Sequence, residues 1–160
     1  MGAPAEPGGV TEVCLVGEED VDLRRELLSR ETAREALATY ALSAPFENSV
    51  AVETVSLGAA VALLNDLNWY LVRFAERALV CEPSVDAEEW LSRALAGRVR
   101  ADELPPAETD RYCLVFGVVD GALVEPLYAR RDGDGGLPEY DLRDVAETVV
   151  VRVTREEFRG

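Results

Sequence analysis

In residues 113–126, CLVFGVVDGALVEP, two apolar runs flank the dipeptide Asp120-Gly121. Asp-Gly is a preferred pair for the type I′ turn of a two-residue β-hairpin, because both positions take positive φ angles. The stretch therefore predicts a hairpin. Pro126 follows in the second strand and has no amide hydrogen for a ladder, so we expect this strand at a sheet edge or at a bulge.

Three other segments have β-strand character: Val13–Val16, Val50–Val55 and Thr148–Val153. A fourth region, residues 70–81, is ambiguous. It contains two apolar runs that resemble those of the later hairpin, but the helical spacing of Leu71, Phe74 and Ala78 would continue the preceding helix. We expect a second hairpin here and keep the helix as the alternative.

Amphipathic helices are predicted over residues 23–28, 32–41, 57–67 and 84–95. We expect a capping box of Thr32 with Glu35 at the start of the second helix. Ser56 is suited to cap the third, and either Ser84 or Asp86 the fourth, with Gly97 beyond its end.

The order of these elements is β-α-β-α-β-β-α-β-β-β, which predicts an α+β fold with a largely antiparallel sheet and helices on one face. The 160 residues suit one domain. We expect a disordered lead-in over residues 1–11, which are rich in glycine, proline and alanine, and a single α+β domain over residues 12–160.

Acidic residues outnumber basic ones by 31 to 16, every basic residue is arginine, and histidine is absent. The formal net charge of −15 opposes compaction, whereas near-molar salt shortens the Debye length to about 3 Å and removes most of the repulsion. We expect a salt-accumulating halophile; an ordinary acidic protein from a GC-rich bacterium is the alternative. The arginines form no basic stripe, so nucleic acid is not an expected partner.

The three cysteines, Cys14, Cys81 and Cys113, lie in apolar runs and form no C-x-x-C pair. We therefore expect buried thiols in a reducing cytosol and no zinc site. The N-terminus has neither a basic start nor an apolar run, and the longest uncharged stretch, residues 54–65, is too short to span a bilayer. The sequence predicts a soluble, cytoplasmic protein with no membrane partner.

The absence of histidine excludes Ser-His-Asp and Cys-His catalysis and removes the commonest metal ligand. Phosphate-binding and dinucleotide fingerprints are also absent, since acidic residues follow Gly17. Residues 132–136, DGDGG, match only the start of a calcium loop and are interpreted as a solvated acidic loop. We expect no cofactor and no metal site, and we name no catalytic residue.

The segment NDLNWY, residues 65–70, provides the candidates for ligand binding. Two amides, a carboxylate and two aromatic rings with polar tips could orient a small ligand; these are Asn65, Asp66, Asn68, Trp69 and Tyr70. The alternative, which we favour, is structural, with Asn68 in the left-handed conformation that ends a helix. Arg24 and Arg73 are candidates for contact with an anionic ligand, although arginines among glutamates usually form a self-paired helix surface.

The runs LSRETAREAL (28–37) and PFENS (45–49), with residues 63–74 and 138–145, resemble a family of small conserved haloarchaeal proteins known as a domain of unknown function. The resemblance covers about residues 13–158 and implies a halophilic archaeal source. It implies no active site, because no catalytic motif comes with it.

The favoured functional hypothesis is a non-enzymatic module that binds a partner protein or a small ligand. It predicts an exposed apolar patch near Trp69, near Trp90 or at the edge strand that contains Pro126. A homodimer formed through free sheet edges is a weaker hypothesis.

The alternative is a carboxylate- or Mg²⁺-dependent enzyme acting on a small metabolite. It predicts that acids converge in a pocket and that the pKa of at least one is raised. Asp66, Glu53 and Asp120 are its candidates.

Overall fold

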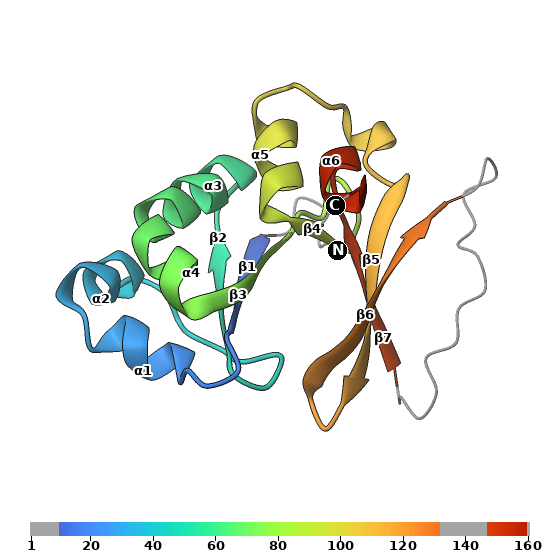
Figure 1. The fold of residues 1–160 in the computed structure, drawn as a ribbon. Helices are drawn as coiled ribbons and strands as arrows, with labels where there is room; N and C mark the ends of the chain where they lie inside the picture. Colours follow the sequence, from blue (N-terminus) through green and yellow to red (C-terminus); the bar gives the residue numbers. More distant parts are fainter. Residues whose placement is uncertain (1–9, 132–146, 160) are drawn as a thin grey trace, which may run out of the picture.

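The computed structural model describes residues 10–131 and 147–159. Within them, seven strands form one sheet in the order β2-β1-β3-β4-β7-β5-β6 (Figure 1). The strands are β1 (Thr11–Gly17), β2 (Ser49–Thr54), β3 (Ala75–Cys81), β4 (Trp90–Ser92), β5 (Tyr112–Val119), β6 (Ala122–Arg130) and β7 (Glu147–Arg152). The helices are α1 (Leu23–Leu28), α2 (Glu31–Leu37), α3 (Leu57–Asp66), α4 (Asn68–Phe74), α5 (Arg93–Arg100) and α6 (Arg155–Arg159), with a 3-10 turn at Pro106–Glu108.

The predicted fold class is confirmed: the chain is an α+β domain, and every strand pair is antiparallel except the parallel pair β4–β7. The succession of β and α elements also matches the predicted order when α1–α2 and α3–α4 each count as one helical region, with α6 after β7. Two of the predicted elements, the strand at residues 70–74 and the helix at residues 84–95, nevertheless have another structure. Most of the predicted lead-in (residues 1–9) and the acidic loop with residues 132–136 lie outside the described residues.

Strand β1 is buried on both faces, which explains why its sequence is an apolar run instead of an alternating one. Val13 and Leu15 belong to the core under the helices, whereas Cys14 and Val16 belong to a second core on the opposite face of the sheet. Because successive side chains of a strand point to opposite faces, one short segment contributes to both cores.

Helices α1 to α5 cover one face of the sheet (Figure 1). Their buried leucines form the first core with Val13 and Leu15 of β1; these leucines are Leu23, Leu27, Leu37, Leu63, Leu64, Leu71 and Leu95. The predicted placement of helices on one face therefore holds for these five. In α6, by contrast, Phe158 packs against the second core.

The second core exists because the sheet curls, so that β5, β6 and β7 stand at an angle to β1, β2 and β3 (Figure 1). Leu79 of β3 packs in one cluster with Leu114 and Phe116 of β5 and with Val151 of β7. Trp90 of β4 lies in the same cluster, at the place where the two halves of the sheet join. The sheet thus covers part of its own second face.

The hairpin predicted around Asp120-Gly121 is confirmed. Asp120 and Gly121 have φ angles of 51° and 82°, as a type I′ turn requires. The flanking strands β5 and β6 pair in the register Val119↔Ala122, and β6 is an edge strand, as the proline in it predicted.

The hairpin predicted over residues 70–81 is wrong. Its first run is helix α4, and only its second run is a strand, β3, which pairs with β1 instead of with the first run. Residues 70–74 are helical because this conformation buries Leu71 in the first core and packs Tyr70 and Phe74 against the same core. The helical spacing, which was the alternative, was the correct signal for this run.

The helix predicted over residues 84–95 is also wrong. Trp90–Ser92 is the short strand β4, and helix α5 starts at Arg93 and contains Gly97. The side chain of Ser92 accepts a hydrogen bond from the amide of Leu95 (3.2 Å) and so caps this later helix. Pairing of β4 with two strands overrides the helical pattern in its sequence.

Two predicted caps do not form. Helix α2 begins at Glu31, with Arg30 as a cap residue that makes no side-chain bond, so Thr32 and Glu35 form no capping box. Asn68 is the first residue of α4 and does not end a helix in the left-handed conformation. The cap predicted at Ser56 is confirmed, because its hydroxyl accepts from the amide of Ala59 (3.0 Å).

A network of charged side chains stabilises the place where β4 joins the two halves of the sheet; this place is called the joint. Arg152 of β7 donates to Glu89 Oε1 (2.7 Å), to Asp86 Oδ1 (3.3 Å) and to Thr109 Oγ1 (2.9 Å). Arg131 donates to the other oxygen of Glu89. The connector before β4 is thereby attached to the segments that flank β5 and to β7.

Asp86 also organises this connector from within. Its carboxylate accepts from the amides of Glu88 (2.9 Å) and Glu89 (2.7 Å). Burial by itself would raise the pKa of Asp86, but these two amides and the charges of Arg152 and Arg131 outweigh it and hold the pKa below its ordinary value.

Replacing the shared carboxylate should destabilise the fold. Glu89→Ala leaves two mostly buried guanidinium groups without their common partner, and we expect the free energy of unfolding to fall by about 2 kcal/mol. Glu88→Ala, at an exposed neighbour on the same connector, should change it by less than about 0.5 kcal/mol. Urea unfolding at fixed KCl measures both, and equal effects of the two substitutions would contradict the role of the network.

Candidate functional site

The two asparagines named as ligand-binding candidates accept hydrogen bonds from an arginine of the same chain. Arg93 donates to Asn68 Oδ1 (2.8 Å), to Asn65 Oδ1 (3.3 Å) and to the carbonyl of Leu64 (3.3 Å). These bonds tie the first residue of α5 to the junction of α3 and α4. Asp66, on the same junction, is exposed, and its carboxylate makes no hydrogen bond or ion pair with another described residue.

Trp69 and Tyr70 form an aromatic cluster with arginines of their own chain. The ring of Trp69 is 48% exposed, and the guanidinium of Arg73 stacks on it at 3.8 Å. Tyr70 meets the same ring edge-on at 5.1 Å. Arg30 also reaches this cluster, with its guanidinium carbon 5.8 Å from the Trp69 ring centre. Arg24, the other arginine named as a candidate for an anionic ligand, is an exposed residue of α1. Of the three positions at which an exposed apolar patch was expected, Trp69 and the edge strand β6 have exposed large side chains, whereas Trp90 is buried.

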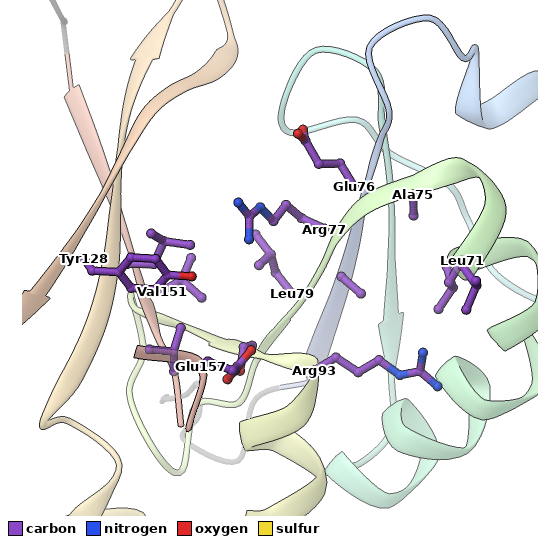
Figure 2. Close-up of a pocket in the computed structure, with 14 residues that line it drawn as sticks. Leu71, Ala75, Glu76, Arg77, Leu79, Arg93, Tyr128, Val151 and Glu157 are labelled. Carbon is purple, nitrogen blue, oxygen red and sulfur yellow. The ribbon is translucent and has the colours of Figure 1, made fainter. Parts of the chain in front are cut away.

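A cavity of about 240 Å³ lies elsewhere, between the two halves of the sheet (Figure 2). One wall comes from the end of α4 and from β3, and the other from β5, β6, β7 and α6. Its floor is apolar, with Leu79, Leu114 and Val151 from the second core. At its mouth, Val72 is 70% exposed and Tyr128 is 47% exposed.

Most of the polar groups along this cavity are occupied by the protein itself. Glu157 accepts from the hydroxyl of Ser92 (2.6 Å) and from the amide of Thr154 (2.8 Å). The amide of Glu157 in turn donates to the hydroxyl of Thr154 (3.0 Å), which is the reciprocal pattern of a capping box at the start of α6. Arg93 extends away toward the asparagines described above (Figure 2).

Arg77 differs from these groups. Its side chain extends from β3 toward Tyr128 and Val151 (Figure 2), and its guanidinium carbon lies 5.4 Å from the ring centre of Phe116. Its Nε atom is buried and has no hydrogen-bond partner. Among the described residues, no carboxylate lies within ion-pair distance of this guanidinium. The cavity therefore contains a positive charge that the rest of the described chain leaves unpaired.

The sequence analysis did not select Arg77, Val72 or Tyr128. A signal for Arg77 was present in the alternation of β3, where Ala75, Arg77 and Leu79 share a face and the arginine interrupts an apolar row. The predicted hairpin obscured this signal, because it paired β3 with residues 70–74 instead of with β1.

The acids proposed for the enzymatic alternative do not converge. Asp66 ends α3, Glu53 lies on β2, and Asp120 lies in the β5–β6 turn. Glu53 faces Glu12 across the β1–β2 ladder, where burial first and the charge of Glu53 second raise the pKa of Glu12. In residues 10–131 and 147–159, no three His, Cys, Asp or Glu side chains are grouped to hold a metal ion.

The three cysteines are free thiols with raised pKa values. Burial raises the pKa of Cys14 to about 12 and that of Cys113 to about 11, and neither side chain is exposed. Burial and the nearby charges of Glu12, Asp86 and Glu82 raise the pKa of Cys81 to about 11, although this thiol is partly exposed. A raised pKa leaves little thiolate at neutral pH, so none of the three is an activated nucleophile.

The rates of thiol labelling should follow the exposure and the pKa values of the three cysteines. At pH 8 about one in a thousand Cys81 side chains is a thiolate, so we expect iodoacetamide to react about 100-fold more slowly than with a free thiol. The rate should rise about tenfold per pH unit, and Cys14 and Cys113 should react only after unfolding in urea. Mass spectrometry of timed samples measures each site; native labelling of Cys14 before Cys81 would contradict the expectation.

No helix within the described part of the chain is long and apolar enough to cross a membrane. The model of one protein family, described as a family of unknown function (DUF5804), matches residues 11–118. This match contains β1 to β4, α1 to α5 and most of β5, and with them Arg77 and Leu79. Neither a curated protein nor a solved structure matches the chain.

Proposed function

The chain belongs to this family of unknown function, and from its geometry we propose that it is a non-enzymatic domain that binds a small molecule in the cavity between the halves of its sheet. The observation that carries the proposal is an apolar floor open to solvent, with a few polar groups around it. This combination is typical of small-molecule sites. Binding at the cavity is the function; no chemical step on the ligand is proposed.

The exposed side chains at the mouth support binding here. Val72 and Tyr128 lie at the mouth, on α4 and on the edge strand β6. A ligand that covers them adds apolar burial at about 25 cal/mol per Å² to what the floor supplies. Trp69 is a weaker candidate, because Arg73 already stacks on its ring.

The walls of the cavity are suited to hold a ligand without rearrangement. Leu79, Leu114 and Val151 lie on strands of one hydrogen-bonded sheet, and the network around Arg152 fixes the joint between its halves. A site that is ordered before the ligand arrives loses less conformational entropy on binding. The volume, about 240 Å³, favours a small metabolite over a nucleotide or a larger cofactor.

A thermal-melt screen with small metabolites, added one at a time in KCl, tests the proposal. A ligand present at 100 times its dissociation constant should stabilise the fold by about 2.7 kcal/mol. Val72→Glu places a charge at the mouth and should reduce this stabilisation strongly. Val55→Glu is the matched control, since Val55 is 91% exposed and does not line the cavity, and it should leave the stabilisation unchanged.

The location of binding is checked independently by amide chemical shifts in the NMR spectrum. Shifts that concentrate on β3, β7 and the end of α4 support the cavity. Saturable binding that is indifferent to Val72→Glu, with shifts at another surface, would refute it.

We also propose that the protein works in a cytosol with molar salt. The net charge of −15 and the free thiols support this setting, because salt screens the repulsion and a reducing compartment keeps cysteines unpaired. The haloarchaeal source implied by the sequence resemblance agrees with it.

The salt dependence of stability tests this setting. The melting temperature should rise between 0.1 and about 2 M KCl, because the Debye length falls from about 10 Å to under 3 Å. A variant with four exposed acids replaced by glutamine should gain less from the same salt; these are Glu19, Glu31, Glu35 and Glu53. A melting temperature that is independent of KCl in both proteins would contradict the proposal.

A further inference from the structure

The guanidinium of Arg77, which has no carboxylate partner among the described residues, indicates which class of ligand the cavity binds. This inference rests on the proposed function. The arginines buried at the joint of the sheet have carboxylate partners: Arg152 contacts Glu89 and Asp86, and Arg131 contacts Glu89. Arg77 has none among the described residues. What distinguishes Arg77 from other arginines without an ion pair, such as the exposed Arg24, is that its Nε is buried and that its side chain lines the cavity.

The position of Arg77 does not require an arginine for folding. Its neighbours on the same face of β3 are Ala75 and Leu79, and its cross-strand partner on β1 is Val16. An apolar side chain would extend this row, whereas the arginine buries an Nε–H that has no acceptor. Such a group costs stability. Residues that cost stability in the free protein commonly serve a binding site.

The exposed end of the guanidinium is available to a ligand. Its two terminal nitrogens are not among the buried atoms without a partner, and they donate no hydrogen bond to a described residue, while the side chain lines the cavity. Below it lie Leu79, Leu114 and Val151, which offer an apolar surface and no further charge. The site therefore combines one planar cationic group with an apolar floor.

We propose that the ligand is a small monocarboxylate with an apolar tail. Its carboxylate pairs with the terminal nitrogens of Arg77, a geometry in which guanidinium and carboxylate form parallel hydrogen bonds. Its tail covers Leu79, Leu114 and Val151 of the floor. The guanidinium carbon of Arg77 lies over the Phe116 ring, and this cation–π contact holds the guanidinium in place.

Charge balance favours a monocarboxylate over a phosphate. One guanidinium can neutralise one negative charge. Glu157, Glu76 and Arg93 also line the cavity, but the guanidinium of Arg93 is held by Asn65, Asn68 and the carbonyl of Leu64. A second negative charge on the ligand would meet these carboxylates and a chain of net charge −15. A dianionic phosphate would therefore lack a counter-charge, whereas a carboxylate would not.

The experiment compares charged and neutral ligands of the same shape. The probes are benzoate with benzamide, hexanoate with hexanamide, and inorganic phosphate, each titrated at constant ionic strength set with KCl. Binding is followed by thermal shift and by the ¹⁵N resonance of the Arg77 Nε, which is assigned by its loss in Arg77→Met. Arg73→Met is the matched control. Arg73 lies in α4, four residues before Arg77, and does not line the cavity.

We expect both carboxylates to stabilise the protein saturably, and each to bind at least tenfold more tightly than its amide. Arg77→Met should abolish this difference, Arg77→Lys should retain part of it, and Arg73→Met should leave it intact. Without ligand, Arg77→Met should melt at a higher temperature than the wild type, because the unpartnered Nε–H is gone. If Arg77→Met does not fold, Arg77→Lys decides the comparison.

Three results would overturn the inference. Equal affinity for amide and carboxylate, with Val72→Glu still blocking both, would show an apolar site without an anion requirement and leave the proposed function standing. No saturable change in the Arg77 resonance with either carboxylate, or preferential binding of phosphate, would also refute it. Binding that Val72→Glu does not affect would instead refute the proposed function itself.

Discussion

The joint at Trp90–Ser92 is the constraint on which the rest of this structure depends. Within the described residues, the strand ladders connect the halves of the sheet only through this short strand, which pairs with β3 on one side and with β7 on the other. Each ladder has two residue pairs. Such a short ladder sets the angle of the halves weakly, so the bonds of Arg152 to the connector before β4 supply the remaining restraint.

The curl at this joint determines what the second face of the sheet can do. Five helices cover the first face, whereas the second is covered by the sheet's own far half, and these surfaces do not fill the whole space between them. The residual space becomes the cavity that contains Arg77. The candidate site is thus a consequence of the topology, and its residues come from segments as distant as Val72 and Glu157.

The two clusters that contain arginine and aromatic rings have different physical character. At Trp69, the stacked Arg73 also donates to the Trp69 carbonyl (2.9 Å), so the group is satisfied within α4. At Phe116, Arg77 has a ring contact but no hydrogen-bond acceptor for its Nε. Arg30, at the edge of the first cluster, also has a buried Nε without a partner, but its guanidinium pairs with Glu26 (3.2 Å) and does not line the cavity. Arg77 lines the cavity and has no carboxylate partner among the described residues.

Local patterns determined much of this protein: the Asp120-Gly121 hairpin, the edge position of the strand with Pro126, the Ser56 cap and the fold class. These features depend on turn chemistry and on periodicity within a few residues. Tertiary structure decided the rest. Residues 70–74 and 90–92 took the conformations that their distant partners allow, because burial of Leu71 and pairing of β4 outweigh weak local preferences. The cavity and the unpaired Arg77 arise from the curl of the sheet, which brings together β3 and β7, strands separated by more than sixty residues, and no local pattern encodes that contact.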